Sequence, residues 1–103
     1  MNDIAWVAGI FEGEGSINLV PNRPSSAALQ VAMTDYDIIL RIQQVLGGNV
    51  YQRKQYKAHH KPCWLWQVTS KEQCYDVLTK LLPWLGERRS YKALNTLDHL
   101  DRI

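Results

Sequence analysis

The sequence has few cysteines and no long apolar run, and these absences exclude several classes of protein. Its 103 residues include two cysteines, Cys63 and Cys74, which cannot form a disulfide framework and fit a reducing compartment. The longest apolar run, Ile4 to Phe11, is far shorter than the roughly 20 residues that span a bilayer. No basic-then-apolar leader precedes it, so we expect a cytoplasmic protein. A hydrophobic content of 46% excludes a disordered chain, and the length predicts one domain over residues 1–103.

Acidic residues are also missing from two long stretches. No Asp or Glu occurs between Gly15 and Thr34, or between Asp37 and Glu72. The basic residues in these stretches are Arg23, Arg41, Arg53, Lys54, Lys57, Lys61 and Lys71, with His59 and His60 among them. The net charge is only +2, so a positive face would arise from this separation if the stretches lie together. If the two acid-free stretches share one face, the charge distribution favours a nucleic-acid partner; otherwise it indicates an ordinary solvated surface.

The hydrophobic pattern predicts helix, two strands, helix, two strands and two further helices. We expect helices over about 4–13, 37–46, 73–82 and from 87, and strands over 16–20, 28–33, 49–56 and 63–69. The second helix follows a T-x-x-D signal at Thr34 and Asp37, and the third follows an S-x-x-Q capping box at Ser70 and Gln73. The last helix is expected to turn Ala93, Leu94, Leu97 and Leu100 inward. Strand pairs separated by a helix favour an α+β fold with an antiparallel sheet.

The first helix carries a stripe of small residues. Ala5, Gly9 and Gly13 recur every four residues and therefore share one helix face. Glycine inside a helix costs about 1 kcal/mol relative to alanine, so two at this spacing indicate that a backbone packs closely there. The partner is either a second chain or the protein's own sheet.

Two glutamates, Glu12 and Glu14, follow at the end of this helix. The C-terminal end of a helix disfavours negative charge, and a carboxylate beside apolar residues needs water, a partner or a metal ion. Hard cations such as Mg²⁺ take carboxylate and carbonyl oxygens. A two-fold axis through the small-residue stripe would bring the acids of two chains together around such ions. The alternative is that both are ordinary solvated residues.

Residues 7–16, VAGIFEGEGS, resemble the signature of the LAGLIDADG homing endonucleases. The repeated helix–strand–strand order and the LPWL segment at 82–85, before a basic final helix, resemble the family too, so the resemblance covers essentially the whole chain. It implies an αββαββα core with a curved antiparallel four-stranded sheet and a C-terminal helix. Because one motif is present, it also implies a homodimer.

The family resemblance implies a site-specific DNA endonuclease that makes a staggered double-strand cut with Mg²⁺ or Mn²⁺. Glu14 matches the family's metal-binding acid, with the Gly13 carbonyl beside it, and Glu12 matches the first acid, whose role is closer to structural. Arg88 falls near the basic active-site position, with Arg89 as the neighbouring candidate. Two positions depart from the pattern: Met33 stands where a glutamine is common, and arginine stands where lysine is frequent.

The resemblance also implies that the sheet lies along the DNA major groove, on a pseudo-palindromic site. Amide and basic side chains suited to base edges are Asn18, Gln30, Gln52, Lys54 and Gln67. Side chains expected at phosphates are Arg23, Arg53, Lys57 and Lys61. A one-residue slip of register would exchange the two faces of each strand.

Other interpretations of single residues and of the whole chain stay open at this stage. Trp64, Trp66 and Trp84 belong either to the core or to a surface that stacks on bases. A zinc site from His59, His60, Cys63 and Cys74 lacks the paired spacing of structural sites. The alternatives to a nuclease are a LAGLIDADG-type DNA-binding protein that does not cut, acting as a regulator or maturase, and a protein-binding dimer.

Overall fold

A computed structural model describes residues 3–19, 27–53 and 62–101 of the chain. Its helices and strands follow the predicted order. They are α1 (Asp3–Glu14), β1 (Gly15–Leu19), β2 (Ala27–Met33), α2 (Tyr36–Leu46), β3 (Asn49–Arg53), β4 (Cys63–Val68), α3 (Lys71–Leu81), a 3-10 turn η1 (Leu82–Trp84) and α4 (Glu87–Asp101). None of the helices within these ranges is long and apolar enough to cross a membrane.

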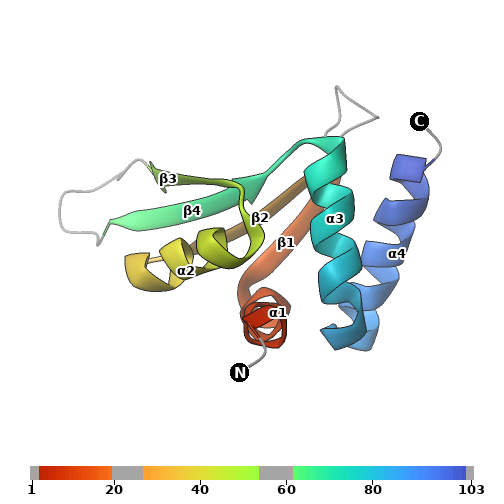
Figure 1. Cartoon of the computed structure of the whole chain (residues 1–103), viewed down its shortest axis with the longest axis horizontal. Coiled ribbons are helices and arrows are strands. Elements are labelled where there is room, and N and C mark those ends of the chain that lie inside the picture. Colours follow the sequence, from red (N-terminus) through yellow and green to blue (C-terminus); the bar gives the residue numbers. More distant parts are fainter. Residues whose placement is uncertain (1–2, 20–26, 54–61, 102–103) are drawn as a thin grey trace.

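The four strands form one antiparallel sheet in the order β1-β2-β4-β3. Helices α1, α2 and α3 lie on one side of this sheet, and α4 lies beyond α3, next to the β1 edge (Figure 1). The predicted α+β class with an antiparallel four-stranded sheet and a C-terminal helix is therefore confirmed.

The core lies between the helices and one face of the sheet. Val7, Ala8 and Phe11 of α1 are fully buried, as are Trp66 and Val68 of β4. Their burial follows from the nearly all-apolar first helix and from the alternation along the strand. Trp66 is thus a core residue, whereas Trp84 is 50% exposed at the turn before α4.

Cys74 belongs to the same core. Its Sγ lies 3.3 Å from the Ala27 carbonyl oxygen and 3.6 Å from that of Val68, and burial raises the pKa of the thiol to about 11. Cys74 is fully buried among core side chains and its Sγ packs against two backbone carbonyls, so it does not face an open metal site. The zinc hypothesis therefore loses this ligand, and His59 and His60 lie outside the described residues.

The helix ends agree with the sequence at one capping signal and disagree at the other. The Gln73 backbone N–H donates to Ser70 Oγ at 3.1 Å, which confirms the capping box. The Thr34–Asp37 signal is wrong, because Asp35 occupies the cap position of α2 and makes no side-chain capping bond.

The buried face of α4 also differs from expectation. Leu94 is 53% exposed, whereas Ala93, Thr96 and Leu100 are buried. These three residues follow the i, i+3, i+7 spacing of one helix face, so a threonine takes a core position that leucine was expected to fill.

Two glycines connect α2 to β3 at positive φ. Gly47 has φ 75° and Gly48 has φ 94°, which L residues rarely adopt. Trp66 Nε1 donates to the Gly47 carbonyl at 2.7 Å and so ties this turn to the core. A Cβ at Gly48 would lie 2.6 Å from Val68 Cγ1, whereas one at Gly47 would have no atom within 4 Å.

The turn provides a matched pair of substitutions. Gly47→Ala should cost about 1–3 kcal/mol of unfolding free energy, because its φ of 75° and ψ of −160° lie in a region that essentially only glycine adopts. Gly48→Ala should cost about 1–3 kcal/mol more, because the added methyl collides with Val68 and Trp66. Urea unfolding followed by Trp fluorescence measures both values, and equal losses would contradict the close packing at Gly48.

Candidate functional site

The first helix continues directly into the first strand, without a linker. α1 ends at Glu14 and β1 begins at Gly15. A Cβ at Gly15 would lie 2.5 Å from Cδ2 of the buried Phe11, so only glycine fits this junction as it stands. The junction therefore fixes Glu14 at the end of a helix that packs one face against the core, while the Glu14 side chain stays exposed.

Arg89, in the first turns of α4, binds this junction. Its Nε donates to the Glu12 carbonyl at 2.7 Å, and its Nη1 donates to the Gly15 carbonyl at 2.6 Å. Nε also lies 3.8 Å from Glu12 Oε2. The C-terminal carbonyls of a helix lack partners within the helix, and this guanidinium supplies one for α1.

The Glu12 carboxylate packs between Arg89 and the chain segment that begins α4. Its Oε2 is enclosed and, among the described residues, has no hydrogen-bond partner. A Cβ at Gly86 would lie 2.5 Å from Glu12 Oε1. Glu12 is thus part of the packing between α1 and the start of α4, in keeping with the structural role that the family resemblance implies.

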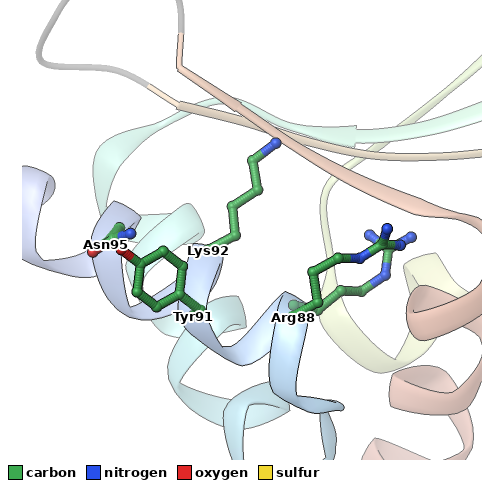
Figure 2. A pocket seen from close by; sticks show the side chains of 5 residues that line it. Arg88, Tyr91, Lys92 and Asn95 are labelled. Atoms are coloured by element: carbon green, nitrogen blue, oxygen red, sulfur yellow. The ribbon is translucent and has the colours of Figure 1, made fainter.

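A basic groove begins at the same end of α4. Its volume is about 430 Å³, and its lining residues are Arg88, Arg89, Tyr91, Lys92 and Asn95. Figure 2 shows Lys92 extending away from α4 toward the strands, with Arg88 one turn earlier on the helix. No carboxylate lines it, and its exposed cations are Arg88 and Lys92, whereas Arg89 is directed at the end of α1, so the groove suits an anion such as a phosphate.

The small-residue stripe of α1 lies on an open face of the helix. Gly9 and Gly13 are exposed, and a Cβ at either position would have no atom within 4 Å. Ala5 is half-buried. The protein's own sheet therefore does not pack against these two glycines in the part of the chain that the structure describes.

The strand pairing assigns each sheet residue to one of two faces. Residues opposite one another share a face, so Gln30 of β2 lies with Gln67 of β4 and Ser16 of β1. Val31 and Trp66 pair on the other face, which the helices cover. The described residues of the uncovered face are Ser16, Asn18, Ala28, Gln30, Ala32, Asn49, Tyr51, Arg53, Cys63, Leu65 and Gln67. None of them is acidic.

This register separates the predicted DNA-contacting residues. Asn18, Gln30 and Gln67 share the uncovered face, and Arg53 joins them. Gln52 lies on the other face, opposite Trp64, because side chains alternate along β3. Arg23, Lys54, Lys57 and Lys61 lie outside the described residues.

Sequence reasoning did not single out Ser16, Asn49 or Tyr51, although all three lie on the uncovered face. They share a sheet face with Gln30 and Gln67, and this shared face is known only after the strands have been paired. Lys92 and Asn95 were missed as well, since their place beside Arg88 depends on the helix face of α4.

The oxygen donors at the end of α1 fit a hard cation. The exposed Glu14 carboxylate and the backbone carbonyls of the same helix end are ligands that Mg²⁺ prefers. Within residues 3–19, 27–53 and 62–101, no three His, Cys, Asp or Glu side chains gather as a metal site.

The packing of Glu12 against Gly86 predicts a dependence between the two positions. Gly86→Ala should lower the unfolding free energy by about 0.5–1.5 kcal/mol, the cost of moving the Glu12 carboxylate off its rotamer to make room for the new methyl. In a Glu12→Ala background the same change should cost much less, since the colliding group is gone. Denaturant unfolding of the four proteins measures the coupling, and additive effects would contradict this contact.

Solved homing endonucleases share this architecture. I-CvuI, in complex with its target in the presence of 2 mM Ca, is 27% identical and superposes with a TM-score of 0.71 over 92% of this chain and 63% of its own. I-LtrWI, a LAGLIDADG homing endonuclease bound to target DNA, is 21% identical with a TM-score of 0.69, over 99% of this chain and 38% of its own. I-TnaI is 14% identical with a TM-score of 0.63, over 96% and 74%.

The chain thus spans less than two thirds of the length of I-CvuI. No family model and no curated protein match its sequence. The structural neighbours are nevertheless LAGLIDADG homing endonucleases over most of the chain, which confirms the resemblance seen in residues 7–16.

Proposed function

Because this chain has the fold of the LAGLIDADG homing endonucleases, we propose that it is a site-specific DNA endonuclease. In this proposal residues 1–103 form one domain, two copies form the enzyme, and Mg²⁺ or Mn²⁺ supports a staggered double-strand cut. The main support is one juxtaposition: a sheet face of amide and basic side chains, without a described acid, adjoins a helix end that presents Glu14.

DNA would lie on the uncovered face of the sheet. Gln30 and Gln67 stand opposite each other there, and paired amides match the donor and acceptor pattern of base edges in the major groove. Asn18 lies on the same face, toward the end of β1. Arg53, with Arg23, Lys57 and Lys61, would contact phosphates and hold the register, while Lys54 would contact a base edge.

A second copy of the chain would cover Gly9 and Gly13. Their open surface lets another helix backbone approach, which a longer side chain would prevent. A two-fold axis along this face makes the interface self-complementary and brings the two Glu14 side chains near each other. It also places identical sheets on two half-sites, which supports a pseudo-palindromic target.

The proposed chemistry divides between the end of α1 and the first turns of α4. Glu14 and the Gly13 carbonyl would hold the cation, which when bound would supply charge stabilisation for phosphodiester hydrolysis. Arg88 is exposed at the mouth of the basic groove, where it would contact the phosphate on which charge develops. Lys92 would hold the adjoining phosphate backbone.

A DNA-binding protein that does not cut is the second candidate. Met33 stands where the family commonly has a glutamine, and its side chain packs against the core instead of offering a polar group. The same sheet face would serve this function, so binding alone does not distinguish the two.

Glu14→Gln should separate cutting from binding. The change keeps the size of the side chain and removes the charge that would hold the ion, so cleavage should fall below detection. Binding in EDTA should stay equal or improve, since two negative charges near phosphates are gone. Gel-shift and cleavage assays on one selected duplex measure both, with Glu72→Gln, an exposed acid at the start of α3, as the control.

Two results would count against this assignment. If Glu14→Gln cuts as fast as the unaltered protein, the cation is held elsewhere. If the unaltered protein binds a duplex specifically and leaves it intact with every divalent ion, the non-cutting candidate replaces the nuclease.

Gly9→Leu should abolish the dimer and leave a folded monomer. Leucine is a better helix former than glycine by almost 1 kcal/mol, so the helix itself is not weakened. The side chain would hold the two α1 backbones apart. Analytical ultracentrifugation at micromolar concentration measures the mass, and Gln44→Leu, on the exposed face of α2, adds similar bulk elsewhere. A monomeric unaltered protein would contradict the dimer.

A further inference from the structure

We propose that Arg89 is a positioning residue that sets the geometry of the cation-binding end of α1. This inference rests on the proposed function, and it assigns Arg89 a role distinct from that of its neighbour Arg88. Arg89 would act through the backbone that carries Gly13 and Glu14, without touching the cation or the DNA.

Arg89 forms hydrogen bonds on both sides of the two residues proposed as cation ligands. Nε binds the carbonyl of residue 12 and Nη1 binds the carbonyl of residue 15, so Gly13 and Glu14 lie between the two anchored peptide groups. Gly15 is itself wedged against Phe11. The backbone on both sides of the ligands is therefore fixed by contacts from outside α1.

The anchor needs the shape of an arginine. A guanidinium presents rigid, coplanar donors that reach two acceptors at once, whereas a lysine ammonium acts as a single point charge. Arg89 has only 18% of its side chain exposed, and its Nε also faces Glu12 Oε2 at 3.8 Å. Nε and Nη1 are thus engaged within the protein, while the exposed Arg88 can reach a phosphate.

Arg89 also offsets the negative charge at the C-terminal end of α1. α1 has two glutamates at its C-terminal end, where the helix dipole disfavours negative charge, and no basic residue in its last turn. Arg89 brings a cation from α4 to that position. Without it, Glu12 would lose its ion-pair partner and the last turn would lose an external hydrogen bond, so Glu14 would sample several orientations.

The test compares Arg89→Met, Arg89→Lys and Arg88→Met in the full-length protein. Arg89→Met should raise the Mg²⁺ concentration for half-maximal cleavage by about 10- to 100-fold, the usual effect of losing an outer group that orients ligands. DNA binding in EDTA should stay within about twofold, because no DNA contact is removed. Arg89→Lys keeps the positive charge but lacks the planar pair of donors, so its half-maximal Mg²⁺ concentration should lie between those of Arg89→Met and the unaltered protein.

Arg88→Met should show the opposite pattern. Cleavage at saturating Mg²⁺ should fall by about 100-fold or more, with the half-maximal Mg²⁺ concentration unchanged, since a phosphate-contacting donor is lost. The proposal would be overturned if Arg89→Met lowered the cleavage rate at saturating Mg²⁺ and left the half-maximal Mg²⁺ concentration unchanged. An Arg89→Met protein with unaltered Mg²⁺ dependence and rate would overturn it as well.

A readout without cleavage keeps this inference separate from the proposed function. Mn²⁺ binding to the protein–DNA complex, followed by electron paramagnetic resonance, should weaken in Arg89→Met by the same factor as Mg²⁺ in cleavage. Amide hydrogen exchange at residues 13–16 should accelerate in that variant and stay unchanged in Arg88→Met. If the unaltered protein never cuts, the nuclease assignment fails, but this inference can still be tested. It is overturned if Arg89→Met binds Mn²⁺ as tightly as the unaltered protein does and exchanges the amides of residues 13–16 at the same rate.

Discussion

The direct passage of α1 into β1 is the constraint on which the rest of the structure depends. A helix with one face in the core ends at Glu14 and an edge strand begins at the next residue, so no loop can absorb a change in direction. Gly15 permits the turn because its Cα lies against Phe11, and Arg89 holds both sides of the turn from α4. One short segment therefore connects the open glycine face, the exposed carboxylate and the sheet.

The distribution of charge follows from this arrangement. The chain is almost neutral overall, yet the uncovered sheet face has no acid among its described residues, and the exposed cations Arg88 and Lys92 line the groove on α4. The acids lie on helices, apart from Asp35 at the cap position before α2, and two of them, Glu12 and Glu14, stand at the end of α1. In the proposed dimer, a polyanion on the sheet would thus meet amides and cations along the described strands and the two Glu14 carboxylates at the centre, where a cation would neutralise them.

Much of the fold was predictable because its patterns are local. The 3.6-residue spacing of α3, the alternation in β4 and the Ser70 capping box are properties of neighbouring residues, and all three are confirmed. Gly47 and Gly48 ended α2 as expected, since both need positive φ. The errors arose where two nearby residues could fill the same position. Asp35 takes the cap position of α2 instead of Thr34, and Thr96 is buried in α4 whereas Leu94 is exposed.

The site was less predictable because it depends on pairing between distant segments. The motif of residues 7–16 pointed to Glu14, but no local pattern tells which sheet face Gln52 joins. The difference between Arg88 and Arg89 was equally hidden. Adjacent helix residues point about 100° apart, and only the packing of α4 beside α1 shows which guanidinium meets the helix end.

The central claim is that two copies of this chain cut DNA with a divalent cation at a site that both copies read. The most direct measurement incubates the unaltered protein with a randomised duplex library, with Mg²⁺ or with EDTA, and sequences both the bound duplexes and any new ends. We expect staggered ends on both strands, only with Mg²⁺, within sequences of approximate two-fold symmetry. Enrichment of a specific duplex that stays intact on both strands with Mg²⁺ and with Mn²⁺ would contradict the account.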